Sequence, residues 1–308
     1  MVGRKKLLLL GGTGFVGSHV LHNALQSGWS VVCATRGGVP KPGVPLLDAA
    51  LQQYYYGYHH SHHDSDHPNS NHKGDPNSND EAQHHHQSNN NNNKEERLQC
   101  FTPPLEFVSL DATSRSQVLA LIADHPDTTA VVSCIGARTH DHVEARRVCG
   151  DANVNIAAAV YTRGPSIQRM VLISAEPLRS SQSRAQSSTF ALPLSLSPQW
   201  RLWRGYFYGK RIAERAVLEN LPGRAVVLRP GVFVYGNGPT ALIGRPMEYA
   251  LRPLHTYGMC TPPMHVDVLA RAVLRAIEDV NTPPGVWDYD KMHSLGVQER
   301  RAEEEIKK

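Results

Sequence analysis

The stretch that decides the fold is Leu7-Leu8-Leu9-Leu10-Gly11-Gly12-Thr13-Gly14-Phe15-Val16-Gly17. Its first four residues are all apolar, which is typical of a strand buried in a parallel sheet. The glycines allow a tight turn and leave room for a phosphate beside the backbone. A helix expected over 14–27 then directs unpaired N–H groups and its positive dipole end at that phosphate. Strand, loop and helix in this order predict a dinucleotide-binding site; the alternative is a purely structural turn.

Strand and helix patterns continue to alternate along the chain. Further apolar strands are expected over 29–35, 105–110, 129–135, 169–173 and 225–228, with helices between them. This alternation predicts an α/β fold, a Rossmann-like doubly wound parallel sheet, as a single domain over 1–308. A small C-terminal helical lobe over 231–295 is expected to cover the substrate side. Before its last helix, Asp267 is the expected N-cap, and His265 is either a hydrogen-bonded structural residue or a substrate contact.

Two segments interrupt the pattern. Residues 39–104 pass from Pro and Gly through tyrosines into a His-, Asn- and Ser-rich tract, and we predict a disordered low-complexity insert there. Nine histidines lie in this tract without fixed ligand spacing, so we expect no metal site. A second irregular insert, rich in Ser and Pro, is expected over 176–199 beside the site.

Composition limits the classes of function. Lys and Arg number 32 against 28 Asp and Glu, and the resulting charge of +4 does not indicate nucleic-acid binding. Cys33 and Cys134 lie in apolar strand segments, which predicts buried free thiols. No run of 18 apolar residues is present, so the sequence predicts no transmembrane helix.

Residues at the ends of the next strands indicate how a dinucleotide would be recognised. Arg36 follows the second strand, where an arginine accommodates the 2′-phosphate of NADP and an acidic residue would bind the ribose of NAD. We therefore favour NADP(H), with NAD(H) as the alternative. Asp111, followed by Ala112, either accepts from adenine or ends the strand as a cap or turn. Gly136, after the fourth strand, leaves space for a ribose.

A second group of residues carries chemistry. Tyr206 and Lys210 are four residues apart and are expected on one helix face, directed at the sheet. A lysine beside a phenol lowers the phenol pKa, which suits Tyr206 to general acid–base work near neutral pH. Ser174 ends the fifth strand nearby.

Together with Leu228-Arg229-Pro230-Gly231 and Val266-Asp267, these motifs resemble the extended and atypical branches of the short-chain dehydrogenase/reductase family. More narrowly, the sequence is similar to a mitochondrial and plastid group. Its members include a ubiquinone-biosynthesis accessory protein and, more distantly, the NADPH-binding accessory subunit of respiratory complex I. The resemblance implies a mitochondrial location, with plastid or cytoplasm as alternatives, and association with an inner-membrane protein complex.

The resemblance also implies roles for individual residues. Gly11, Gly14 and Gly17, with Thr13, Phe15 and Val16 of the same loop, would hold the pyrophosphate, and Arg36 the 2′-phosphate. Asp111 and Ala112 would meet the adenine and Gly136 the ribose. Tyr206 would be the acid, Lys210 would orient the ribose and tune Tyr206, and Ser174 would hold the substrate oxygen. The family serine usually lies one or two residues further on, where this chain has Ala175 and Glu176.

Three hypotheses follow. The first is an NADP(H)-dependent oxidoreductase that acts on a carbonyl or an alcohol, such as a quinone precursor, with Tyr206 protonating the carbonyl oxygen. The second is a catalytically silent nucleotide-binding accessory protein of a quinone or respiratory complex. A sugar-nucleotide epimerase-like activity ranks last, because the lobe is short.

Overall fold

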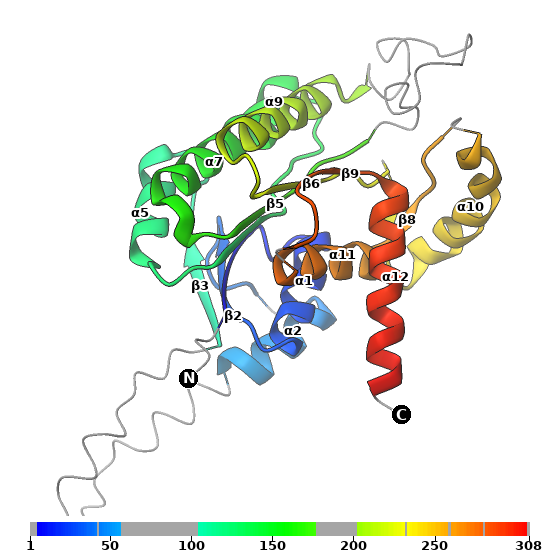
Figure 1. The fold of residues 1–308 in the computed structure, drawn as a ribbon, viewed down its shortest axis with the longest axis horizontal. Coiled ribbons are helices and arrows are strands. Elements are labelled where there is room, and N and C mark those ends of the chain that lie inside the picture. Colours follow the sequence, from blue (N-terminus) through cyan, green and yellow to red (C-terminus); the bar gives the residue numbers. More distant parts are fainter. Residues whose placement is uncertain are drawn as a thin grey trace, which may run out of the picture.

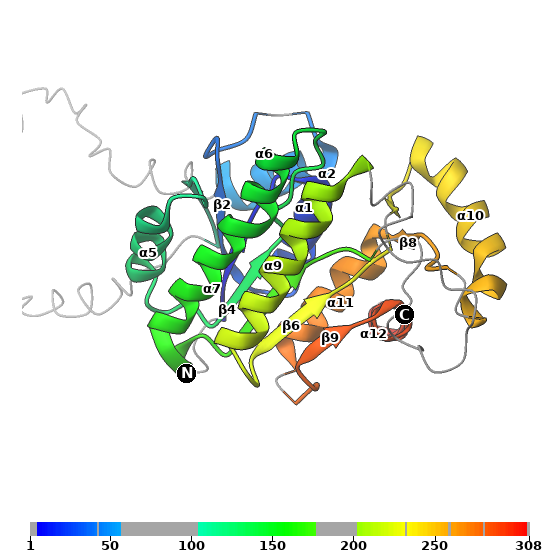
Figure 2. The ribbon, with the colours of Figure 1, turned by 90° about the horizontal axis from the view of Figure 1, so that it is seen from above.

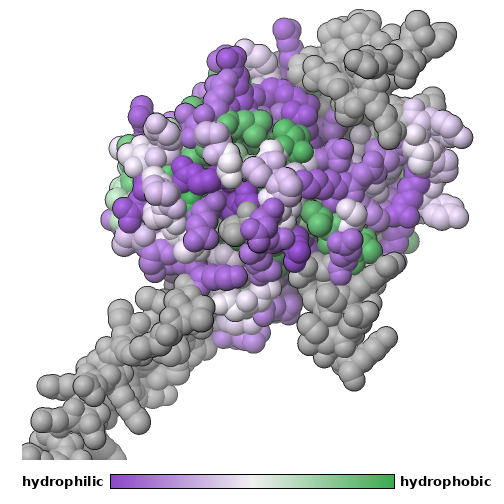
Figure 3. Space-filling model, viewed as in Figure 1, coloured by the Kyte–Doolittle hydropathy of each residue, from purple (hydrophilic) through white to green (hydrophobic). Residues whose placement is uncertain are grey.

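The computed structural model describes residues 5–41, 43–56, 104–176, 202–231, 233–257, 260–279 and 281–306. Most of both predicted inserts, 57–103 and 177–201, lies outside these ranges, and so do Cys100 and the nine histidines of the first insert. Within the described residues, no helix is both long and apolar enough to cross a bilayer. The face seen in Figure 3 is mainly hydrophilic, and its apolar atoms occur in small separate groups.

A seven-stranded parallel sheet in the order β3-β2-β1-β4-β5-β6-β9 forms the centre of the fold (Figures 1 and 2). The predicted Rossmann-like doubly wound sheet is therefore confirmed. Successive strands are added towards one edge of the sheet from β1 to β3 and towards the other edge from β4 onwards. Ligands of such folds bind at the carboxyl ends of the strands where this order changes, between β1 and β4. The strands are β1 (Lys6–Leu10), β2 (Ser30–Thr35), β3 (Leu105–Ser109), β4 (Ala130–Ser133), β5 (Arg169–Ile173), β6 (Ala225–Leu228) and β9 (Gly285–Trp287).

Helices cover both faces of this sheet, which explains why its central strands are apolar throughout. Leu7 and Leu9 of β1 pack in one cluster with α1 (Phe15–Gln26) and α11 (Val266–Glu278). Leu8 and Leu10 point the other way, into a cluster that includes α5 (Arg115–Asp124), α7 (Ala152–Arg163) and α9 (Arg204–Asn220). Alternate residues of one strand thus stabilise two separate cores.

The helix expected between the fourth and fifth strands is present but is not uniform. It begins as α6 (His142–Arg146), widens into the π-helical turn η2 (Arg147–Asp151) and continues as α7, followed by the 3₁₀ turn η3 (Gly164–Ser166). Gly150 in η2 packs against the backbone of Gly209 in α9, where a side chain on either residue would be crowded. The π turn and this close contact bring the two helices together beside the ends of the strands.

The prediction of a disordered insert over 39–104 is wrong for its first part. Residues within 39–104 form α2 (Pro45–Ala50) and the π-helical turn η1 (Leu51–Tyr56), and Leu47, Ala50 and Leu51 are buried against the α1 side of the sheet. Pro45 at the first helical position and the apolar spacing that follows are ordinary helix signals. The average composition of the whole segment is dominated by the polar tract downstream, so it does not reveal this short helix.

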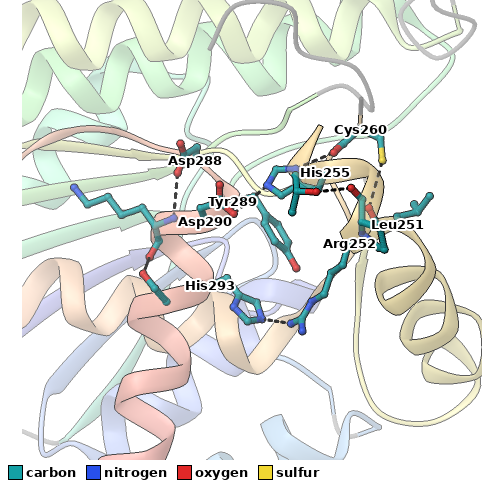
Figure 4. Close-up of polar contacts among 12 residues, drawn as sticks. Leu251, Arg252, His255, Cys260, Asp288, Tyr289, Asp290 and His293 are labelled. Carbon is teal, nitrogen blue, oxygen red and sulfur yellow. Dashed lines mark hydrogen bonds and ion pairs between the residues drawn. The ribbon is translucent and has the colours of Figure 1, made fainter. Parts of the chain in front are cut away.

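Residues 231–295 contribute to two regions. Within this span, α11 and β9 pack onto the main sheet, whereas α10 (Pro239–Thr256) projects from it beside the small parallel pair β7 (Val234–Tyr235) and β8 (Met264–His265). Helix α12 (Tyr289–Ile306) lies against α11. Figure 4 shows side chains joining α10 to α12: His255 contacts Asp290 at 3.0 Å, and Arg252 contacts His293 at 2.7 Å.

The start of α11 corrects another prediction. Asp267 is not the N-cap; His265 is, and its Nδ1 accepts from the Asp267 backbone N–H at 3.2 Å. His265 is therefore the structural residue among our two alternatives. The Asp267 carboxylate instead lies 2.6 Å from Nδ1 of His19 and ties α11 to α1. This pairing spans 248 positions in the chain, and local spacing does not reveal it.

Candidate functional site

The glycine loop closes tightly around the first turn of α1. Gly11 has φ +78°, and its carbonyl oxygen accepts from the Gly14 N–H at 3.1 Å. A Cβ on Gly17 would overlap that same oxygen and would stand 2.8 Å from the Gly12 Cα. Gly14 is the N-cap and offers no capping side chain, so the N–H groups of the first turn are directed outwards. This geometry suits an anion, as the sequence predicts.

A cavity of about 960 Å³ extends from this loop towards β2 and β3. Several predicted cofactor residues line it, which brings together segments more than 100 positions apart: Gly11, Thr13, Gly14, Arg36, Asp111, Ala112 and Gly136. Sequence reasoning missed further lining residues, among them Lys41, Thr113, Gln117, Arg147 and Val148. Arg147 and Val148 enter the cavity from η2, a π turn for which the sequence gives no periodic signal.

The outer part of this cavity is rich in positive charge. Arg36 is exposed at the end of β2, and its backbone oxygen accepts from the Ser109 hydroxyl at 3.2 Å. Lys41 and Arg147 line the same cavity, and Asp111 is the one carboxylate among its described lining residues. Arg147 is held there by an ion pair with Glu144, at 2.8 and 3.1 Å, and by donating to the Thr113 hydroxyl at 2.9 Å.

Of the two roles predicted for Asp111, adenine contact or strand-end turn, the structure shows the turn. Its Oδ1 accepts from both the backbone N–H and the hydroxyl of Thr113, at 3.0 and 2.7 Å. These hydrogen bonds are the main reason that the pKa of Asp111 lies below its usual range. The carboxylate is therefore ionised at neutral pH, and the adenine contact remains a prediction for Oδ2.

A second cavity of about 360 Å³ adjoins the first and shares Gly14, Cys134 and Gly136 with it. The remaining predicted site residues line this cavity: Phe15, Val16, Gly17, Ser174, Tyr206 and Lys210. All predicted residues thus line two adjoining cavities at the ends of the five strands β1 to β5.

Lys210 is the anchor of the smaller cavity. Its buried Nζ donates to the carbonyl oxygens of Ile135 and Ile173, at 2.8 and 2.6 Å, and so joins the ends of β4 and β5. Burial lowers the pKa of Lys210 below its ordinary value. A Cβ on Gly136 would stand only 3.2 Å from this ammonium, so the glycine leaves room for the lysine beside it.

Tyr206 lies beside Lys210 as predicted, but its acidity is not what we predicted. The Lys210 Nζ stands 5.9 Å from the ring centroid of Tyr206. Burial raises the pKa of Tyr206 to about 12, with a further increase from Cys149 and an opposing effect from Arg138. Desolvation outweighs nearby positive charge, so the phenol keeps its proton at neutral pH. The group is a proton donor here and not a ready base.

Ser174 has a different environment from the one we predicted. It is 2% exposed, and its hydroxyl donates to the buried carboxylate of Glu214. Glu214 also accepts from Arg229 at 2.7 and 3.0 Å and from Arg211 at 2.7 Å. The single proton of Ser174 is therefore committed to this buried ion-pair cluster, which does not favour the predicted contact with a substrate oxygen.

The buried thiols are confirmed in part. Cys33 and Cys134 are free; Cys33 is fully buried and Cys134 is largely so. Burial raises the pKa of each thiol to about 12, so neither is a nucleophile at neutral pH. The Cys33 sulfur packs under the loop, where a Cβ on Gly12 would collide with it.

Sheet order and glycine loop together define a fold of the Rossmann type. Residues 7–61 match the model of the NAD dependent epimerase/dehydratase family. An uncharacterized chloroplastic protein of Arabidopsis thaliana is 34% identical over 169 residues, which are 49% of this chain and 50% of that protein. The chain thus matches about half the length of this curated relative.

Solved structures of nucleotide-dependent enzymes share the fold. The Bordetella bronchiseptica enzyme WbmG in complex with NAD has a TM-score of 0.51 and 14% identity, covering 93% of this chain and 73% of its own. UDP-glucuronic acid 4-epimerase from Bacillus cereus in complex with NAD has 0.51 and 16%, covering 92% and 77%. dTDP-4-dehydrorhamnose reductase from Bacillus anthracis in complex with NADP has 0.51 and 12%, covering 94% and 75%. The fold is that of NAD-dependent epimerases and dehydratases.

Proposed function

We propose that this protein binds a nicotinamide dinucleotide, with NADP(H) preferred, and reduces a carbonyl substrate. The observation that carries the proposal is the pair of joined cavities, with Arg36 at one end and Tyr206 at the other. The glycine loop lies between them, where the pyrophosphate of a dinucleotide would need to be held. Solved relatives of this fold are bound to NAD or NADP.

The residues present fit such a cofactor. The bare first turn of α1 leaves its backbone N–H groups available to a diphosphate, and the absence of a Cβ at Gly17 lets this turn pack against the backbone of Gly11 and Gly12. Gly136 keeps a ribose-sized space open beside Lys210, whose ammonium is already held by two carbonyl oxygens. Arg36 and Lys41 supply the positive charge that a 2′-phosphate requires, whereas the charge of the neighbouring Arg147 is paired with Glu144.

The chemistry of the chain's own groups is proton donation. A bound nicotinamide would supply the hydride. Tyr206 holds its proton at Oη because its pKa is about 12, and it would deliver that proton to the substrate oxygen as negative charge develops there. Lys210 fixes the ends of β4 and β5, which keeps the cavity wall in place while the substrate binds.

Two paired variants test the proposal. Arg36→Gln should weaken NADPH binding about tenfold or more and leave NADH binding unchanged, because a charge-assisted contact to the 2′-phosphate is lost. The control Arg215→Gln removes an arginine that pairs with Glu219 on the exposed side of α9 and should change neither affinity. Equal losses of NADPH and NADH affinity in Arg36→Gln would contradict the NADP(H) preference.

A second pair of variants tests the proposed role of Tyr206 in proton donation. Tyr206→Phe should abolish NADPH oxidation with a carbonyl panel, while NADPH affinity stays within about twofold. Tyr208→Phe is the control, because Tyr208 is half exposed on the same helix and lies outside the smaller cavity. Full turnover in Tyr206→Phe would refute the assigned acid.

The commitment of Ser174 to Glu214 favours a second candidate, a nucleotide-holding accessory protein without turnover. NADPH would then raise the melting temperature by mass action, yet no carbonyl would oxidise it. A quinone-related substrate or an inner-membrane complex as partner remains a proposal, supported by sequence resemblance. The organelle is a proposal as well: the resemblance favours the mitochondrion, whereas the Arabidopsis relative is named chloroplastic.

A further inference from the structure

Helix α10 buries very little of its own surface. Gly244 is the single buried residue of this helix, and a Cβ there would overlap the Tyr235 ring of β7. Further along, the Glu248 carboxylate accepts from the Tyr235 hydroxyl and, at 3.3 Å, from that of Tyr289 in α12. These contacts fix the first part of the helix, so its C-terminal half, residues 249–256, depends on other contacts.

Two polar contacts to α12 hold that half (Figure 4). His255 lies 3.0 Å from Asp290, and Arg252 lies 2.7 Å from His293. The Tyr289 ring lies between the two histidines, edge-on to His255 and stacked on His293, with ring centroids 5.0 and 5.5 Å apart. The two histidine contacts are therefore parts of one cluster.

The partners of His255 require its charged form. Its Nδ1 lies 2.8 Å from the Cys260 carbonyl oxygen, and its Nε2 lies 3.0 Å from the Asp290 carboxylate. Both partners are acceptors, so both ring nitrogens must carry a proton, and only the imidazolium does so. Loss of one proton would turn a nitrogen lone pair towards an oxygen and remove one of the two hydrogen bonds.

The partner of His293 requires the opposite state. A guanidinium can only donate, so Nε2 of His293 must accept from Arg252, which needs the neutral ring. Burial and the charge of Arg252 lower the pKa of His293, against the opposing charges of Glu248 and Asp290. A proton on Nε2 would remove this hydrogen bond and place two positive charges in contact. Glu248, 3.7 Å from the same nitrogen, compensates only in part, because it already accepts from two tyrosines and from Arg252.

We propose that these two contacts form a histidine latch, which holds the C-terminal half of α10 on α12 only while His255 is charged and His293 is neutral. Both changes of state belong to the range in which imidazoles exchange protons, about pH 5 to 8. Because the pKa of His293 is lowered in the attached state, attachment weakens as the pH falls below about 6.5, the ordinary value for histidine. At higher pH, His255 loses the proton that one of its contacts needs.

The latch bears on the smaller cavity. Helix α10 packs on β7, and Val234 of β7 lines that cavity together with the preceding Phe233. Release of α10 would therefore loosen one wall of the cavity and make access to it depend on pH. This inference goes beyond the proposed function and does not require a bound cofactor.

Hydrogen exchange of the full chain tests the latch, expressed as protection factors so that the intrinsic pH dependence of exchange cancels. We expect protection of residues 249–256 to be highest between about pH 6 and 7, and to fall about threefold or more towards pH 5 and towards pH 8. Protection of α11 should stay constant over the same range.

Three variants separate the two halves of the latch. His293→Gln should abolish the fall on the acid side, because the glutamine oxygen accepts from Arg252 and does not titrate. Arg252→Gln should abolish the same fall independently, since it removes the charge that protonated His293 would face. His255→Gln should abolish the fall on the alkaline side. The control His125→Gln alters a histidine that contacts Lys6 at the start of β1, and it should keep the wild-type profile.

The contrary results are equally defined. A wild-type profile without a maximum overturns the latch, and so does an acid-side fall that persists in His293→Gln or Arg252→Gln. Equal loss of protection in α10 and α11 also overturns it, because the whole fold then loosens. These measurements are made without NADPH, so they leave the proposed function to its own tests.

Discussion

Gly17→Ala is the substitution whose effect follows most directly from the geometry. The new Cβ would overlap the Gly11 carbonyl oxygen and would stand 2.8 Å from the Gly12 Cα. Both obstacles are backbone atoms, so no side-chain rotation relieves the overlap. Helix α1 must shift away from the loop, and a forced shift of this kind costs about 1–3 kcal/mol of folding stability. The same shift moves the N–H groups of the first turn away from any bound diphosphate.

A matched control separates stability from binding. Gly296→Ala places a Cβ against the carbonyl oxygen of Val268, at the contact of α12 with α11 and away from both cavities. Both variants should lose a similar amount of stability in urea unfolding. NADPH affinity should fall about tenfold or more in Gly17→Ala and stay unchanged in Gly296→Ala. If folded Gly17→Ala binds NADPH as tightly as the wild type, the assignment of the loop is refuted.

Three further predictions concern individual groups. Tyr206 should remain un-ionised at pH 10, where an exposed tyrosine is about half ionised, because burial raises its pKa to about 12. Extra phenolate absorbance at pH 10 in the wild type relative to Tyr206→Phe would contradict this. Burial tends to raise the pKa of Glu214, but the hydrogen bond from Arg229 and the charges of Arg211 and Arg229 outweigh it and hold that pKa below its usual range. A carboxyl whose pKa is lowered in the folded state stabilises the fold above about pH 4. Glu214→Gln should therefore lower the free energy of unfolding by about 2–3 kcal/mol at pH 7. The difference in that free energy between the variant and the wild type should shrink as the pH falls below about 4. Ser174→Ala should cost about 1 kcal/mol and leave NADPH affinity unchanged; undiminished stability with loss of turnover would instead restore Ser174 as a substrate-binding group.

Local sequence patterns were sufficient to predict the parallel sheet and the loop that follows its first strand. Leu7 to Leu10 are apolar because both faces of β1 are covered, and the glycine loop must follow where the strand ends. The spacing of Tyr206 and Lys210 placed both on one side of α9, and both line the smaller cavity. Patterns of this kind arise from contacts within a few residues, which a sequence displays directly.

The missed features depend on contacts between distant positions. Ser174 and Glu214 are 40 residues apart, and the sequence around Ser174 does not indicate that its hydroxyl has a buried carboxylate partner. Arg147 reaches the larger cavity through a π turn, and the acidity of Tyr206 is set by burial, which periodicity does not measure. The helices over 45–56 were hidden by the polar tract that follows them.

A crystal structure of the full chain grown with NADP⁺ tests the central claim most directly. We expect the pyrophosphate over the first turn of α1, between Gly14 and Gly17, with the 2′-phosphate at Arg36 and the nicotinamide beside Tyr206. A dinucleotide bound elsewhere, or none bound at a concentration that saturates other proteins of this fold, would contradict it.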